Sequence, residues 1–365
     1  MSQLTYTLPR KYFASQEIYQ EEVAKIFRRE WFAVGRVEQI AKAGQYFLVP
    51  FGQDNIIVLR DNEGQVQAFH NVCRHRGTRL CSAESGQLKK TIQCPYHAWT
   101  YALNGQLIGA PGMNIVSGFD KADFPLHSVP VHVWGGMIFI NLSNNKLSFE
   151  TIFGPDKIAF FAPWQLDDLQ AVKTTVYDVK ANWKIIFQNY SECYHCPIIH
   201  PEYSSLSHFE SGETLFTEGS VLGGTMIIDK EEGGITLDGK MAAPPFAGIV
   251  GQKRQEVHFY TIFPNMMITL APDHVVQYRL QPLAKDHTII HCSYLWHRDQ
   301  VAQDGFNPES TIEVWDITNR QDWPLTEQTQ LGVQSSAYTP SPYYDIQEQP
   351  LHYIDQMVLQ KLGHL

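Results

Sequence analysis

Four residues in the first third of the chain place thiol and imidazole side chains on two short segments. One residue separates Cys73 from His75, and two separate Cys94 from His97. Two sulfur and two nitrogen donors suit either a tetrahedral zinc ion or a [2Fe–2S] cluster in which cysteines bind one iron and histidines the other. Zinc sites more often use Cys-x2-Cys and His-x3–5-His pairs, so the spacing favours the iron–sulfur cluster.

A second group of metal-binding residue types lies in the segment ANWKIIFQNYSECYHCPIIHPE, residues 181–202. It contains His195 and His200, with Glu192 three residues before the first histidine. On a straight helix the two imidazoles would point about 140° apart, so they can bind one metal only if the helix is distorted. Pro197 is expected to cause that distortion at Cys196.

Two histidines and one carboxylate form the Fe(II) site of non-haem oxygenases, which leaves coordination positions open for O2. The C-terminal helical stretch offers two candidates for the carboxylate, Asp316 and Asp322.

The remaining cysteines carry less specific signals. Cys193 and Cys196 have the Cys-x2-Cys spacing of a redox pair, but the neighbouring histidine and glutamate explain that segment better. Cys81 has no disulfide partner in the second Cys/His segment, and Cys292 is predicted to be a core residue.

Composition excludes several classes of protein. The 365 residues carry a net charge of −10, which argues against nucleic acid as the main partner. We expect no membrane span, because no apolar run reaches about 18 residues. The N-terminal MSQLTYTLPRKYF has no apolar signal region, so a cytoplasmic location is expected.

The elements that must position these groups form an α+β chain. A helix is predicted over 15–30, followed by a small β domain with short strands and turns at Asp61–Gly64 and Asn104–Gly105. The second region combines helices with an antiparallel sheet. Its predicted helices are 153–161, 183–194, 310–336 and 351–362; the predicted strands of the two regions are 46–49, 56–59, 67–72, 137–140, 169–180, 258–270, 274–280 and 288–296.

The segments CRHRG (73–77) and CPYHAW (94–99) resemble those of Rieske non-haem iron oxygenases. Ala98 stands where many relatives have glycine and is expected to alter the loop backbone slightly. With the second group, the resemblance extends over nearly the whole chain to the oxygenase α subunit. Relatives place the ligand aspartate five residues before a glutamate, with a glutamine soon after. Asp322, Glu327 and Gln330 match that spacing, so the resemblance favours Asp322.

The ECYHCP segment resembles the branch that acts on quaternary ammonium compounds, such as carnitine, glycine betaine and choline monooxygenases. That branch has glutamate at the position of Glu192, where most ring-hydroxylating relatives have aspartate. The resemblance implies a homotrimer in which Glu192 bridges His195 to a cluster histidine, His75 or His97, of a neighbouring subunit.

The resemblance also implies three parts of the chain: an N-terminal helical arm (1–40) packing on the catalytic domain, an all-β Rieske domain (41–145) and a helix-grip catalytic domain (146–365). Cys73, His75, Cys94 and His97 would hold a [2Fe–2S] cluster, and His195, His200 and Asp322 a mononuclear Fe(II).

No G-x-G-x-x-G nucleotide motif follows a strand, so NAD(P)H must be oxidised by a separate flavin and ferredoxin-type reductase. The predicted reaction is hydroxylation of a C–H next to a quaternary nitrogen, with C–N cleavage as a consequence. A cationic substrate would be held by aromatic faces, with Tyr190 as a candidate wall. The alternatives are an aromatic-acid hydroxylase or demethylase, and a Rieske electron carrier without catalytic iron.

Overall fold

The structure is a computed structural model that describes residues 4–143 and 148–365. The chain divides into two compact units, one of residues 31–144 and one of residues 1–30 with 145–365. The predicted boundary at 145/146 falls in the segment outside the described residues. The boundary predicted at residue 40 differs from this division, because β1 pairs with β10 and thereby joins residues 31–40 to the β unit.

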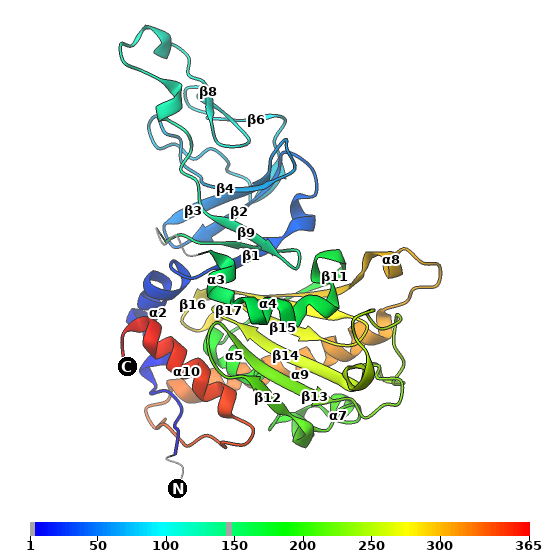
Figure 1. Cartoon of the computed structure of the whole chain (residues 1–365). Coiled ribbons are helices and arrows are strands. Elements are labelled where there is room, and N and C mark those ends of the chain that lie inside the picture. Colours follow the sequence, from blue (N-terminus) through cyan, green and yellow to red (C-terminus); the bar gives the residue numbers. More distant parts are fainter. Residues whose placement is uncertain (1–3, 144–147) are drawn as a thin grey trace. The chain divides into compact units, whose positions relative to one another are not determined.

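Short antiparallel strands make up the unit of residues 31–144 (Figure 1). Its three sheets have the orders β1-β10-β9, β4-β3-β2-β5 and β6-β7-β8. The strands are β1 (Phe32–Arg36), β2 (Gln45–Phe51), β3 (Asp54–Arg60), β4 (Val66–His70), β5 (Ser85–Gln87), β6 (Thr91–Gln93), β7 (Thr100–Ala102), β8 (Leu107–Gly109), β9 (Val131–Trp134) and β10 (Met137–Ile140). Short 3-10 turns cover Val37–Ile40, Met113–Ile115 and Lys121–Asp123.

A seven-stranded antiparallel sheet forms the centre of the second unit, with the order β11-β17-β16-β15-β14-β13-β12. These strands are β11 (Leu169–Val179), β12 (Glu213–Phe216), β13 (Val221–Ile227), β14 (Glu256–Ile262), β15 (Met266–Leu270), β16 (Val275–Ala284) and β17 (His287–His297). The strand predicted over 258–270 is two strands, because the turn after Ile262 contains Pro264, which has no N–H for a sheet ladder. The α+β prediction is confirmed.

The helices of this unit are α1 (Lys11–Ala14), α2 (Gln16–Glu22), η1 (Val23–Phe27), α3 (Phe149–Phe153), α4 (Pro155–Phe161), α5 (Trp183–Tyr190), α6 (Cys196–Ile199), α7 (Pro201–Ser204), α8 (Arg298–Val301), α9 (Glu309–Gln334) and α10 (Gln349–Leu362). Short 3-10 turns cover Ala162–Trp164, Leu166–Asp168, Phe209–Ser211 and Gly251–Gln255. The helix predicted over 183–194 ends at Tyr190, so Glu192 lies in a loop rather than on a helical face.

Helices α5 and α9 pack side by side against the sheet, and this pair positions the site (Figure 1). Gln330 of α9 accepts a hydrogen bond from the backbone N–H of Asn182, and Glu327 accepts one from that of Lys180. Asn182 in turn caps α5 through its side chain. These contacts fix the start of α5 against α9, so both residues that supported the choice of Asp322 have a structural role.

The N-terminal arm belongs to the same unit as α5. Glu22 accepts hydrogen bonds from the indole N–H of Trp183 at 2.9 Å and from Nζ of Lys184 at 2.5 Å. Both members of the Glu22–Lys184 ion pair are completely buried. Removing either partner would leave an uncompensated buried charge, so this contact ties the arm firmly to α5.

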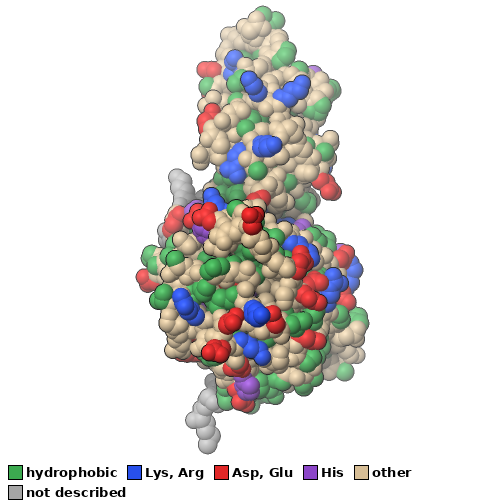
Figure 2. Space-filling view, turned by 90° about the vertical axis from the view of Figure 1, so that its right-hand side faces the viewer, with side chains coloured by type: hydrophobic (Ala, Val, Ile, Leu, Met, Phe, Trp, Pro, Cys, Tyr) green, Lys and Arg blue, Asp and Glu red, His purple; other side chains and the backbone are tan. Residues whose placement is uncertain are grey.

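The surface carries charges of both signs. On the face in Figure 2, lysine and arginine side chains lie interspersed with aspartate and glutamate. Within the parts of the chain that the structure describes, no helix combines the length and apolar character that crossing a bilayer requires.

Candidate metal centres and active site

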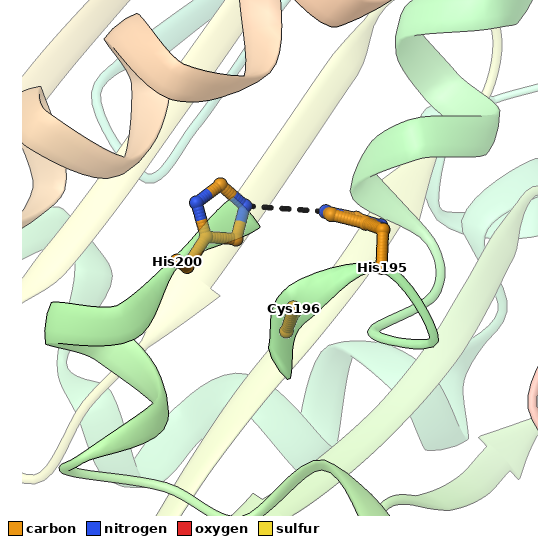
Figure 3. A group of neighbouring side chains, drawn as sticks. All are labelled: His195, Cys196 and His200. Atoms are coloured by element: carbon orange, nitrogen blue, oxygen red, sulfur yellow. Dashed lines mark hydrogen bonds between the residues drawn. The ribbon is translucent and has the colours of Figure 1, made fainter. Parts of the chain in front are cut away.

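Three side chains from two distant segments converge beside α5. The Nε2 atoms of His195 and His200 lie 3.2 Å apart, and Oδ1 of Asp322 lies 2.9 Å from Nε2 of His200 and 3.3 Å from Nε2 of His195. Figure 3 shows the two imidazoles turned toward each other across this short distance. Ligands at right angles around a metal at about 2.1 Å are separated by about 3.0 Å, so the triangle has the size of a metal-binding face.

Local sequence explains how the two histidines converge. His195 precedes α6, and Pro197 lies in the first turn of α6, where a missing N–H costs nothing. The helix stops at His200, which has φ −120° and ψ 68°. Pro201 disfavours helical geometry at the residue before it, so the distortion is at His200 and not, as predicted, at Cys196.

The other candidate ligands have partners elsewhere. Asp316 accepts hydrogen bonds from the hydroxyl of Tyr177 at 2.5 Å and from Nε of Arg320 at 2.8 Å. Cys196 belongs to a group with His195 and His200 whose donor atoms lie within 4.8 Å of one another (Figure 3). Its sulfur is bonded to Cys193 and is therefore not free as a thiolate. Asp322 is the better third donor.

The electrostatics of the triangle favour a cation. Burial raises the pKa of Asp322, but the hydrogen bonds from His195 and His200 outweigh it and hold this pKa below its usual range. Burial lowers the pKa of His195, but hydrogen bonds to Asp322 and Glu192 outweigh it and raise this pKa to about 10. Asp322 and Glu192 thus stabilise positive charge at His195. A metal ion bound to Nε2 of His195 would take the place of the proton there.

Glu192 contacts the histidine that follows it. Its Oε1 lies 2.6 Å from Nδ1 of His195, while Oε2 accepts hydrogen bonds from the backbone N–H groups of Tyr194 and His195. A carboxylate on Nδ1 orients the ring and leaves Nε2 for a metal, as in many histidine metal sites.

The two Cys/His segments of the β unit form a pair of loops. Cys73 and Cys94 are buried and free of disulfides, whereas His75 is exposed and His97 partly so. The imidazole rings of His75 and His97 lie 4.8 Å apart between centroids. Sulfur donors inside and nitrogen donors outside match a cluster with one cysteine-bound and one histidine-bound iron.

The backbone of these loops is held by hydrogen bonds and by turns of positive φ. The hydroxyl of Tyr101 lies 3.3 Å from Sγ of Cys73 and accepts a hydrogen bond from the N–H of Arg74. Gly77 has φ +76°, and Ala98 has φ +58°. Ala98 adopts the left-handed conformation that glycine favours, at a cost of about 1–2 kcal/mol.

Comparison with known proteins matches both halves of the chain. Residues 30–120 match the Rieske [2Fe–2S] domain, and residues 166–364 match the ring hydroxylating alpha subunit (catalytic domain). The chain belongs to the Rieske ring-hydroxylating oxygenase family.

Relatives within this family include enzymes named for quaternary ammonium compounds. The glycine betaine monooxygenase oxygenase subunit of Pseudomonas aeruginosa is 30% identical, with 93% of this chain and 85% of that protein covered. The carnitine monooxygenase oxygenase subunit of Acinetobacter baumannii is 29% identical, with 92% and 87% covered. The solved structure of a quaternary ammonium Rieske monooxygenase, described as giving insights into carnitine oxidation by gut microbiota and inter-subunit electron transfer, has a TM-score of 0.80 at 25% identity. It covers 99% of this chain and 96% of that chain.

A cavity lies beside the triangle of this Rieske oxygenase. Its aromatic lining residues are Tyr190, Tyr203, Phe259, Tyr278, Trp315 and Trp323. The hydroxyl of Tyr190 lies 2.7 Å from Oγ1 of Thr269, which fixes that ring in the wall of the cavity. Apart from the two histidines, the charged lining residues are Glu192, Glu213 and Asp322, and no lysine or arginine is among the described residues that line the cavity.

Three features of the site were not found from the sequence. Cys193 and Cys196 form a disulfide that closes the loop around His195, so the Cys-x2-Cys spacing does mark a bonded pair. Asn189 donates a hydrogen bond to Oδ1 of Asp322 at 3.2 Å, and Oε1 of Gln321 lies 2.8 Å from Nδ1 of His200. Gln321 directly precedes the candidate ligand Asp322 in the sequence, and this position could have indicated that its side chain reaches the same histidine.

Proposed function

We propose that this chain is the oxygenase component of a two-component monooxygenase that hydroxylates a C–H next to the nitrogen of a quaternary ammonium compound. The hydroxylated carbon then carries both oxygen and nitrogen, and breaking its C–N bond gives an amine and an aldehyde. A separate flavin and ferredoxin-type reductase would supply electrons from NAD(P)H. The observation that carries the proposal is an aromatic cavity that opens onto the His195, His200 and Asp322 triangle and whose described lining has no lysine or arginine.

Each part of the site has a task in this proposal. Cys73, His75, Cys94 and His97 would hold the [2Fe–2S] cluster, and His195, His200 and Asp322 would hold an Fe(II) that activates O2 when bound. A quaternary ammonium group cannot donate a hydrogen bond, so aromatic faces must bind it, each contact contributing about 0.5–2 kcal/mol. Tyr190 and the other rings of the cavity supply such faces, and the carboxylates add favourable charge.

In this proposal, electrons pass from the cluster of one copy of the chain to the mononuclear iron of a neighbouring copy. Glu192 already contacts His195 through Oε1, and a carboxylate can accept further hydrogen bonds on its remaining lone pairs. We propose that a cluster histidine of a neighbouring subunit in a homotrimer, His75 or His97, donates to Glu192. The inter-subunit electron transfer described for the solved carnitine-oxidising relative supports this arrangement.

The lining charges speak against an aromatic acid as substrate. An aromatic acid brings no positive charge that could pair with Glu192 and Glu213 of the lining, whereas every quaternary ammonium compound does. An electron carrier without catalytic iron is disfavoured by the catalytic-domain match over residues 166–364.

Aerobic turnover with a matched reductase tests the proposal. The panel is choline, glycine betaine, carnitine and γ-butyrobetaine against benzoate and methoxybenzoate. We expect at least one ammonium compound to give an amine and an aldehyde, with three irons per chain. Turnover of the aromatic acids alone would overturn the substrate class, and two irons per chain with no turnover would indicate a carrier.

A further inference from the structure

A relay of two side chains lies on the side of His200 that faces away from the metal triangle. Oε1 of Gln321 lies 2.8 Å from Nδ1 of His200, and Nε2 of Gln321 donates to Oε2 of Glu202 at 3.0 Å. His200 is 1% exposed, so its ring nitrogens depend on these protein partners. We propose that Glu202 and Gln321 are positioning residues that set the tautomer of His200 for metal binding. This inference rests on His200 being a ligand, as in the proposed function.

The chemistry of the three groups determines the direction of each hydrogen bond. An ionised carboxylate only accepts, so the amide of Gln321 must turn its NH2 group toward Glu202. Its carbonyl oxygen then faces His200 and also only accepts, so Nδ1 of the neutral imidazole must carry the proton. Nε2, which contacts Oδ1 of Asp322 and Nε2 of His195, is then the ring nitrogen that would offer its lone pair to a metal ion in place of a proton.

Helix α9 supplies two of the side chains that contact the His200 ring. Gln321 and Asp322 are adjacent on α9, and they contact opposite sides of the His200 ring. Glu202 lies on α7, two residues after His200, so the relay also closes the α6–α7 segment onto α9. The two histidines of the triangle are therefore supported differently, His195 by a carboxylate and His200 by an amide that a carboxylate orients.

Exchange of the two side chains tests the relay. Glu202→Gln replaces a carboxylate that only accepts with an amide that can also donate, so Gln321 can turn its NH2 toward His200 and favour the wrong tautomer. Gln321→Ala removes the acceptor altogether. The double variant Glu202→Gln with Gln321→Glu reverses the order, because the new carboxylate accepts from both His200 and the new amide.

The measurement is Co(II) affinity of the cluster-containing protein after removal of mononuclear iron, by competition with a colorimetric chelator. We expect each single variant to weaken binding 10–100-fold, the usual effect of losing a partner of a metal-bound histidine, and the exchange variant to recover to within about threefold of wild type. Gln328→Ala, at an exposed position on the same helix, is the matched control and should bind normally.

Two results would overturn the relay: single variants that bind Co(II) like wild type, or an exchange variant as weak as Glu202→Gln while its thermal unfolding midpoint equals that of wild type. His200→Ala distinguishes this failure from a failure of the proposed function. If His200→Ala loses Co(II) while Glu202→Gln keeps it, only the relay is wrong; if His200→Ala keeps Co(II), the ligand assignment itself is wrong.

Discussion

Glu192 and His195 form a direct contact of 2.6 Å between Oε1 and Nδ1, within a loop and not along a helix. Glu192→Gln keeps the size of the side chain but weakens its acceptor, and Glu192→Asp shortens its reach. With either variant we expect both metal sites to stay occupied and the reductase to reduce the cluster at the normal rate. Substrate-coupled reoxidation of the cluster by O2, followed by stopped-flow absorbance, should slow at least tenfold.

The same variants separate the other roles that Glu192 could have. Loss of mononuclear iron from Glu192→Gln would identify the residue as a ligand, and unchanged reoxidation would show that it is not part of the electron path.

Asp322 and Asp316 offer a matched pair on one helix. Asp322→Ala removes an oxygen that lies 2.9 and 3.3 Å from the two imidazoles, so mononuclear iron and turnover should be lost while the cluster spectrum remains. Asp316→Ala breaks contacts to Tyr177 and Arg320, neither of which belongs to the metal triangle, so its iron content should match wild type. Metal analysis with electron paramagnetic resonance checks both. The reverse pattern would make Asp316 the ligand.

Substitutions at Ala98 and Gly77 measure how much the left-handed backbone conformation in the cluster loops costs in stability. Ala98→Gly should stabilise the protein by about 1 kcal/mol, because alanine pays for the left-handed conformation. Gly77→Ala should destabilise it by a similar amount, since a Cβ there meets no atom within 4 Å and only the backbone cost remains. Anaerobic urea unfolding of the cluster-containing protein measures both. A less stable Ala98→Gly variant would contradict this reasoning.

Asp355 of α10 should make stability depend on pH. Burial raises its pKa to about 7, although hydrogen bonds from Tyr343 and Gln188 oppose the shift. The native state therefore holds a proton that the unfolded chain loses near its ordinary pKa of 3.8, so stability falls as pH rises from about 4 to 7.

Asp355→Asn removes the part of the pH dependence of stability that comes from the titration of Asp355. The free energy of unfolding of wild type minus that of the variant should fall by about 1.4 kcal/mol per pH unit in this window and level off above about pH 7. Parallel pH profiles of the two proteins would show that Asp355 is ionised in the folded state.

The sequence predicted those features that depend on residues close together in the chain. The Cys/His loops, the histidine pair and most strands with alternating residues were found, because ligand spacing and a period of two are visible in short windows. Strand β1 was missed because its pairing with β10 is about a hundred residues distant. Strand β13 was missed because Gly223 and Gly224 interrupt its pattern.

The geometry around the site depended on contacts between distant segments. Pro201 was visible in the sequence, but its effect on His200 became clear only once α6 was seen to end there. Gln321 gains its role from Glu202, which lies more than a hundred residues earlier on another helix. No periodicity or motif brings two such residues together.

Single-turnover reoxidation of the cluster tests the central claim most directly. Chemically reduced protein, free of reductase, is mixed with O2 in the presence of choline, glycine betaine, carnitine or benzoate, and the cluster absorbance and the amine product are followed. The account predicts that an ammonium compound accelerates reoxidation and yields amine in proportion to the active sites, while benzoate does neither. Reoxidation that no ammonium compound accelerates, or that benzoate alone accelerates, would contradict it.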